Sequence, residues 1–289
     1  DTEYNLYIFY VTILPYEGSF VTQNISLESK LLLTLEEKGL SVFTTDDAKD
    51  ILKTTDSSIW HILNRLVHKK RIQRIERKRY LLIPAKAGIE GYWAESPWVI
   101  VSHLIDTYYV GFWTAMNFWD MTEQIPYTVF VATTKRKRNL EYLKQRFEFV
   151  TLSKKKFFGF VEQKAGNKET FNISSREKTI VDGLMHPEYC GGIVEVTKAM
   201  WNARKEINWK IVLKMAEKVE INAVLKRLGY LLSILNIEEK ISEKTKEKIK
   251  KNPYHYLDPT TNKDKIENSK EYGLYINRSK DELLAWMDY

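Results

Sequence analysis

Residues 41–84 contain two short amphipathic segments followed by a basic hairpin, and this order constrains the fold more than any other stretch of the chain. In the first segment, SVFTTDDAKDIL, Thr45 is a suitable cap for a helix whose first turn is acidic. In the second, TTDSSIWHILNRLVHKKRI, a cap at Asp56 or Ser57 precedes an apolar stripe with helical spacing. The stripe consists of Ile59, Ile62, Leu63 and Leu66. The hairpin, QRIERKRYLLIP, predicts strands at residues 71–75 and 79–83.

This order predicts a winged helix-turn-helix with the chemistry to bind DNA. The second helix carries, opposite its stripe, side chains able to reach base edges: Ser57, Ser58, His61, Asn64, Arg65 and His68. The wing supplies cations for phosphate contact: Arg74, Arg77, Lys78 and Arg79. Two alternatives stay open, because many winged helices mediate only protein contacts and His61 suits an ordinary surface position. Trp60 fits either the core or a DNA contact.

The domain organisation follows from changes in composition along the chain. Residues 1–25 include YNLYIFYVTIL, which is too short for a membrane span and lacks the features of a signal peptide, so we predict an extended arm or strand. The winged domain occupies residues 26–84 and opens with a helix at 26–38. Residues 85–97, rich in Gly, Ala and Pro, form a linker. Residues 98–289 form a second, mixed domain, so the predicted fold class is α+β with a helical C-terminal part.

The second domain contains periodic segments of both kinds. Helices are predicted at 98–109, 114–119, 174–185, 194–202, 209–219 and 221–235, and residues 240–251 are a strongly charged helix or linker. Strands are predicted at 127–133, 147–152, 157–162, 171–173 and 274–277. Four consecutive cations follow the first of these strands and are possible further phosphate contacts, although a solvated loop would look the same: Lys135, Arg136, Lys137 and Arg138.

Charge and cysteine content limit the partners and the compartment. The chain of 289 residues has a formal net charge of +7 and a pI near 9.1, which favours an acidic partner such as double-stranded DNA. Cys190 is the only cysteine, which excludes a disulfide within one chain and fits a reducing, cytoplasmic interior. No segment predicts a membrane partner.

Catalytic motifs are weak or absent in the sequence. It has no glycine-rich phosphate loop and no His-Glu-x-x-His, and its five histidines lack a metal-ligand spacing. Cys190 with His186 is a weak nucleophile pair. Glu162 and Lys164 resemble part of a nuclease site but lack an upstream carboxylate. We therefore predict no enzyme activity, no cofactor and no metal, and keep a metal-dependent nuclease as a minor alternative.

The segment SSREKTIVDGLMHPEYCGGIVEV resembles the AbiEi-type antitoxins of type IV toxin–antitoxin pairs. The matching positions are Ser174, Glu177, Lys178, Thr179, Asp182, Pro187, Tyr189, Gly191 and Gly192. The segments YYVGFWTAMNFWDMTEQIPYTVFVATTKRKR and RIERKRYLLIP are also similar to the family, and the resemblance covers roughly residues 26–240. The family's wing often has Gly at its tip, whereas this chain has Arg77 and Lys78, so a less tight hairpin is expected.

The resemblance implies an autorepressor that binds inverted repeats upstream of its own operon. Because one wing reads only a half-site, a homodimer on the DNA is expected. Its functional partner would be a nucleotidyltransferase-like toxin, with no direct contact required. Ser174, Glu177 and Asp182 would be structural, with Ser174 and Glu177 forming a capping box. Asp182 could pair with Glu195 across two helices, although a core salt bridge or a cap explains each better. The alternative to the antitoxin is a standalone transcription regulator whose C-terminal domain senses a ligand or dimerises.

Overall fold

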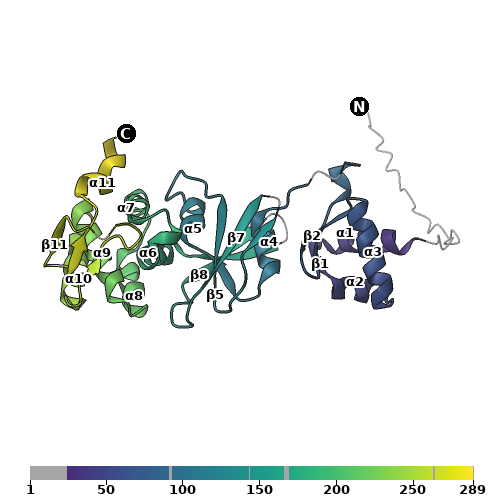
Figure 1. The fold of residues 1–289 in the computed structure, drawn as a ribbon, viewed down its shortest axis with the longest axis horizontal. Helices are drawn as coiled ribbons and strands as arrows, with labels where there is room; N and C mark the ends of the chain where they lie inside the picture. The colour runs from purple at the N-terminus through teal and green to yellow at the C-terminus, as the bar shows by residue number, and fades with distance from the viewer. Residues whose placement is uncertain (1–24, 91–92, 143, 166–168, 263, 289) are drawn as a thin grey trace, which may run out of the picture.

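The chain folds into a mixed α+β structure in three successive regions (Figure 1). The computed structural model describes residues 25–90, 93–142, 144–165, 169–262 and 264–288. Helices α1–α3 with a small sheet lie at one end, a six-stranded sheet lies in the middle, and helices with a second small sheet lie at the other end. The predicted N-terminal arm falls outside the described residues except for Ile25.

The first region has three helices and a hairpin in the predicted order, and one further strand, β1, that was not predicted. They are α1 (Leu27–Lys38), β1 (Val42–Thr44), α2 (Thr45–Leu52), α3 (Asp56–His68), β2 (Ile72–Glu76) and β3 (Arg79–Leu82). The antiparallel sheet has the order β1-β3-β2. Both predicted caps were too late, by one residue for α2 and by one or two for α3: Thr44 caps α2 in a capping box with Asp47, and Thr55 caps α3. Threonine at each position accepts the backbone N–H three residues on, which leaves the next residue helical.

Both faces of this small sheet are buried. On one face, Phe43, Ile72 and Leu82 pack with the apolar stripes of α1, α2 and α3. On the other face, buried side chains pack with the middle region: Val42, Ile75, Leu81 and Ile83. Since side chains alternate across a strand, a sheet that is apolar on both faces must be covered on both. The small sheet therefore joins the helices to the rest of the chain.

The middle region is built on a six-stranded sheet with the order β6-β7-β5-β4-β9-β8. Its strands are β4 (Tyr108–Val110), β5 (Thr128–Thr133), β6 (Leu140–Tyr142), β7 (Gln145–Thr151), β8 (Phe160–Ala165) and β9 (Glu169–Ser174). Helices α4 (Pro97–Leu104) and α5 (Phe112–Phe118) precede and follow β4. One short 3₁₀ turn, η1 (Ala85–Ala87), lies between β3 and α4.

Two sequence predictions for this region were wrong. A single helix was expected at 98–109, but α4 ends at Leu104 and Ile105 is extended, with φ −158° and ψ 136°. The following Tyr108, Tyr109 and Val110 favour a strand, and they form one between β5 and β9. Strand β6 was not predicted at all, because its three residues are too few to show alternation.

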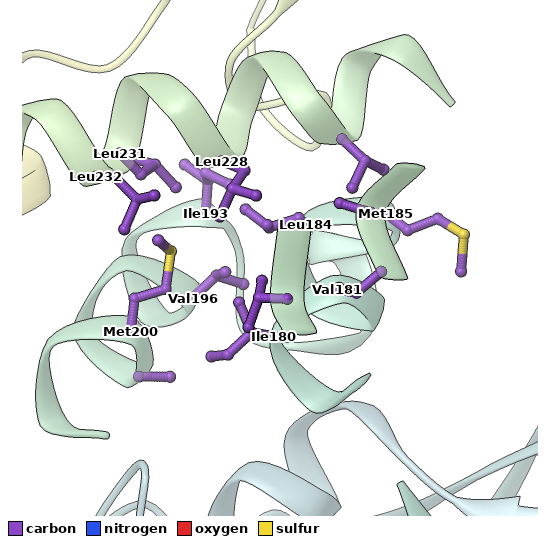
Figure 2. Packing of buried hydrophobic residues seen from close by; sticks show 14 of the residues in the cluster. Ile180, Val181, Leu184, Met185, Ile193, Val196, Met200, Leu228, Leu231 and Leu232 are labelled. Carbon is purple, nitrogen blue, oxygen red and sulfur yellow. The ribbon is translucent and has the colours of Figure 1, made fainter. Parts of the chain in front are cut away.

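The third region is mainly helical and packs around α9. Its helices are α6 (Arg176–Met185), α7 (Ile193–Asn202), α8 (Trp209–Lys218), α9 (Asn222–Leu235), α10 (Glu239–Lys248) and α11 (Lys280–Leu284). It also contains the turns η2 (Pro187–Tyr189) and η3 (Ala285–Asp288) and the strands β10 (His255–Tyr256), β11 (Glu267–Ser269) and β12 (Leu274–Ile276). In Figure 2, Leu228, Leu231 and Leu232 of α9 point toward the apolar side chains of α6 and α7. No described helix combines the length and the apolar character needed to cross a bilayer.

Two buried cations attach the C-terminal segment to α9. The ammonium of Lys226 donates to the carbonyl oxygens of Lys251, Pro253 and Gly273 at 2.6–3.1 Å. The guanidinium of Arg227 donates to three further carbonyls, those of Leu184, Tyr256 and Leu257. Burial lowers the pKa of both side chains, so these hydrogen bonds compensate for the water that each cation has lost.

Replacing Leu81 with Ala should destabilise the protein substantially, because Leu81 is fully buried on the face of the small sheet that meets the middle region. We expect a loss of about 2–5 kcal/mol in the free energy of unfolding, measured by urea denaturation. Leu33→Ala is the matched control, since Leu33 is 57% exposed on α1 and should change stability by about 0.5 kcal/mol or less. Equal effects of the two substitutions would contradict the burial of this face.

Candidate nucleic-acid interface

Helix α3 exposes a polar face because its apolar stripe is buried. Ile59, Ile62, Leu63 and Leu66 are each at most 2% exposed and pack in the core of the first region. The opposite face leaves Ser57 and His61 exposed, with Ser58 and Asn64 partly buried at its margins. Trp60 also lies on the exposed face and is 61% exposed. The sequence left open whether Trp60 lies in the core or on the surface. Because Ile59 belongs to the buried stripe, the next residue along the helix, Trp60, points away from the core.

Arg65 is bound to helix α1. Its Nε lies 2.6 Å from Oε1 of Glu28, and Nζ of Lys69 lies 2.5 Å from the other oxygen of the same carboxylate. The hydrogen bond from Arg65 and then that from Lys69 lower the pKa of Glu28, so the carboxylate is charged at neutral pH. Part of the positive charge predicted to meet DNA is therefore compensated within the protein, and Arg65 helps to hold α3 against α1.

The hairpin β2–β3 is tight, contrary to the expectation of a looser wing. Glu76 is opposite Arg79, so only Arg77 and Lys78 form the turn. Lys78 adopts φ 63°, the left-handed conformation that glycine would otherwise supply. Both turn residues are exposed. The departure from the glycine of the family pattern therefore does not open the hairpin.

The cations of the hairpin differ in how much of their charge is available. Arg79 lies 3.2 Å from Glu76, and Nε of Arg74 donates to the backbone carbonyl of Glu76 at 3.4 Å. Arg77 and Lys78 form no ion pair with any described residue. The positive charge of Lys78 contributes to lowering the pKa of Asp56, after the larger effect of Lys49. The backbone carbonyl of Lys78 also accepts the N–H of Thr45 at 3.0 Å, so the hairpin tip lies against the start of α2.

The second basic segment, residues 135–138, lies beside the hairpin. Nζ of Lys137 is 2.9 Å from Glu76, and its ammonium lies over the ring of Phe149. A second contact joins the same two regions, since the hydroxyl of Tyr142 donates to the side chain of Gln73 at 2.7 Å. Lys135, Arg136 and Arg138 are exposed. Of the four predicted cations, Lys137 therefore holds the segment in place, and the other three extend the basic surface of the hairpin.

The motif of α6 forms a buried polar cluster that joins this helix to β4. Lys178 and Asp182 form an ion pair with both side chains fully buried. The hydroxyl of Tyr109 donates to Asp182 at 3.0 Å and accepts from Lys178 at 3.1 Å. Burial raises the pKa of Asp182, against the opposing effect of Lys178, and burial also raises the pKa of Tyr109. All three side chains of the cluster are buried, so the cluster is a structural link between α6 and β4.

The remaining motif residues are also in structural positions, and the prediction of a capping box at Ser174 and Glu177 was wrong. The cap of α6 is Ser175, whose side chain accepts the N–H of Lys178, whereas Ser174 bonds to Thr179 and Glu177 accepts the N–H of Asn208. The proposed capping box of Ser174 and Glu177 is therefore incorrect, because the helix begins one residue later. Asp182 and Glu195 do not pair, since Glu195 accepts from Thr122, and Asp182 instead forms the core salt bridge with Lys178 that the sequence analysis favoured.

The turn that follows α6 depends on glycine. Gly191 and Gly192 have φ values of 76° and 93°. A Cβ at Gly191 would lie 3.1 Å from the ring of Trp113, so the close contact with this indole also favours glycine there.

The residues considered for catalysis do not assemble a site. Cys190 is completely buried, and burial raises the pKa of its thiol well above the ordinary value. Glu162 and Lys164 lie on β8, where Glu162 accepts a hydrogen bond from Thr170 at 3.0 Å. In the part of the chain that the structure describes, no three His, Cys, Asp or Glu side chains are grouped as metal ligands would be.

Comparison with known proteins shows a shared fold. No protein-family model matches the chain, and no curated protein matches it. Among solved structures, the crystal structure of the RV2827C protein from Mycobacterium tuberculosis is similar, with a TM-score of 0.64 and 12% sequence identity. The match covers 91% of this chain and 95% of that one. At 12% sequence identity the similarity shows a shared fold and nothing about function. The shared fold extends over nearly the whole chain.

Lys178→Met should destabilise the protein by about 3–5 kcal/mol, because it leaves the buried carboxylate of Asp182 without its cation. The free energy of unfolding measured with urea at neutral pH tests this. Lys155→Met is the control, since Lys155 pairs with Glu220 while its side chain is 74% exposed, and it should cost about 1 kcal/mol or less. A stable Lys178→Met variant would mean that the pair contributes little.

Proposed function

We propose that the first region is a winged helix-turn-helix that binds double-stranded DNA. In this proposal α3 enters the major groove and the β2–β3 hairpin is the wing that contacts the backbone. The observation that carries it is the exposed charge of Arg77 and Lys78, which form no ion pair with any described residue, at the tip of a tight hairpin whose strand β2 contacts α3. The three-stranded order β1-β3-β2 beside three helices is the arrangement expected for such a domain.

The two parts of the proposed interface have different roles. Ser57, His61 and Asn64 present hydrogen-bonding groups on the open face of α3, which suits the reading of base edges. The cations at the hairpin tip suit phosphate contact, and those of residues 135–138 lie close enough to continue it, as the Lys137–Glu76 pair indicates. Arg65 and Arg79 contribute less, because each is already held by a glutamate.

We further propose that the protein is the antitoxin of a type IV toxin–antitoxin operon and represses that operon. This step rests on the resemblance of residues 174–192 and of the preceding segments to the AbiEi-type antitoxins. The buried positions of Lys178, Thr179 and Asp182 support a structural role for the motif, and the proposal includes no enzyme activity. Neutralisation of a nucleotidyltransferase-like toxin would then not require a catalytic group on this chain.

One observation favours the alternative of a ligand-sensing regulator. A pocket of about 360 Å³ lies where the first region meets the middle region. Its lining includes Glu36 of α1, Trp93, Val99 of α4 and Glu169 of β9. A small molecule bound there would contact both regions at once, and so could alter how the first region is held.

Replacing Arg77 and Lys78 with Gln should weaken binding on operator and scrambled DNA alike. Loss of two phosphate contacts should reduce the slope of log K against log salt by about 2. Lys210→Gln with Lys214→Gln is the matched control, since both lysines are exposed on α8 and the change in net charge is the same. The measurement is fluorescence anisotropy across a salt series. An unchanged slope in the hairpin variant would contradict the wing assignment.

Co-expression with the product of the neighbouring toxin gene tests the antitoxin half of the proposal. The full chain should restore growth of cells that express the toxin, and the Arg77→Gln/Lys78→Gln variant should still do so when expressed from an unrelated promoter. This outcome is expected because repression uses the hairpin of the first region, whereas the family resemblance implies that the C-terminal domain, residues 98–289, counters the toxin. Failure of the parent chain to protect would contradict the antitoxin assignment and favour the ligand-sensing regulator.

A further inference from the structure

The six-stranded sheet has two edges with different surroundings. At one end, β6 is close to the first region through the hydrogen bond from Tyr142 to Gln73. At the other end, β8 pairs with β9 and with no other described strand. Since an unpaired edge can pair with another chain, β8 is the edge of this sheet at which an additional strand could bind.

Strand β8 is exposed over most of its length. Phe160 and Val161 are 37% and 38% exposed, and Glu162 and Lys164 are also exposed. Only Ala165, at its end, is buried. A six-residue edge strand that exposes two large apolar side chains is unusual, because natural edges are generally short, bulged or covered.

The hydrogen bonds of β9 show which backbone groups of β8 point outward. The carbonyl of Gly159 accepts the N–H of Ser175 at 2.8 Å, which makes this a hydrogen-bonded pair. Such pairs alternate along an antiparallel ladder, so the backbone groups of Val161 and Gln163 also face β9. The N–H of Asn172, which is opposite Glu162, points the other way and donates to Tyr108 at 3.4 Å. Glu162 and Lys164 therefore direct their backbone groups away from β9.

We propose that β8 is a homodimerisation edge, at which β8 of a second copy pairs antiparallel about a two-fold axis at Gln163. In this register Glu162 lies opposite Lys164 of the second copy, and Lys164 lies opposite its Glu162. Both pairs use backbone groups that point outward, so each pair can exchange its two backbone hydrogen bonds. The two sheets become one continuous sheet through the dimer.

The charges of Glu162 and Lys164 favour this register, and they favour a second copy of the chain as the partner of β8. A two-fold axis at Glu162 would place two carboxylates opposite each other, and an axis at Lys164 would place two ammonium groups opposite each other. Opposite charges across an antiparallel pair stabilise it and like charges destabilise it. The sequence Glu162-Gln163-Lys164 is therefore complementary to a second copy of itself.

The dimer would add to the proposed function without depending on it. A two-fold protein matches an operator built from inverted repeats, because each copy would bind one half-site. The dimer forms through β8 alone, far along the chain from α3 and the hairpin. Its test therefore uses the full chain without DNA, and a negative result there leaves the DNA-binding proposal to be judged by its own experiment.

Sedimentation equilibrium of the full chain over a range of concentrations tests the proposal. The parent chain should show a concentration-dependent dimer. Glu162→Lys and Lys164→Glu should each weaken it about tenfold or more, because each substitution turns two attractive pairs into repulsive ones. The double variant Glu162→Lys/Lys164→Glu restores opposite charges in every pair and should recover dimerisation. Lys214→Glu, at an exposed site on α8, should have no effect.

Folding of each variant is checked by far-UV circular dichroism, so that loss of the dimer is separated from loss of structure. A parent chain that is monomeric at all concentrations would overturn the proposal and would indicate that another segment or partner covers β8. A dimer that is equally stable in both single variants would also overturn it, because the interface would then lie elsewhere. Failure of the folded double variant to recover would exclude the Gln163 register.

Discussion

The two-sided burial of the small sheet is the constraint on which the candidate interface depends. One face of this sheet packs on α1–α3, and the other packs on the middle region. The apolar side chains on both faces of the small sheet are buried away from water. This packing fixes the position of α3 and of the hairpin relative to the six-stranded sheet of the middle region. The same packing places residues 135–138 next to the hairpin, where Lys137 pairs with Glu76.

This arrangement changes how the basic residues of the chain are interpreted. Some basic side chains of the first and middle regions form ion pairs within the protein, and others lie exposed on the surface. Arg65, Arg79 and Lys137 neutralise glutamates and fix elements relative to one another. Arg77 and Lys78, together with Lys135, Arg136 and Arg138, keep their charge exposed. The net charge of +7 is therefore less informative about a DNA contact than the positions of these few side chains.

The local elements of the first region could be predicted from the sequence, but their partners could not. The stripe of α3 has a clear period, the start of α3 was predicted to within two residues, and the boundaries of α1 and of both hairpin strands were predicted to within one. Strand β4 was missed because Tyr108–Val110 follows an apolar helix with only a short break, so the two were taken as one helix. The Lys178–Asp182–Tyr109 cluster joins residues about 70 positions apart, and no local pattern reveals a contact of that kind. For the same reason Arg65 was considered available, because Glu28 lies 37 residues before it.

Binding of the purified full chain to the DNA upstream of its own gene, compared with scrambled DNA across a salt series, tests the central claim most directly. The account predicts tight binding that prefers the upstream sequence and weakens steeply with salt, since exposed cations contact phosphates and α3 reads base edges. Equal and weak binding to both DNAs would contradict it. The exposed charges of the hairpin would then be a solvated surface, and the function of the chain would have to lie in its other regions.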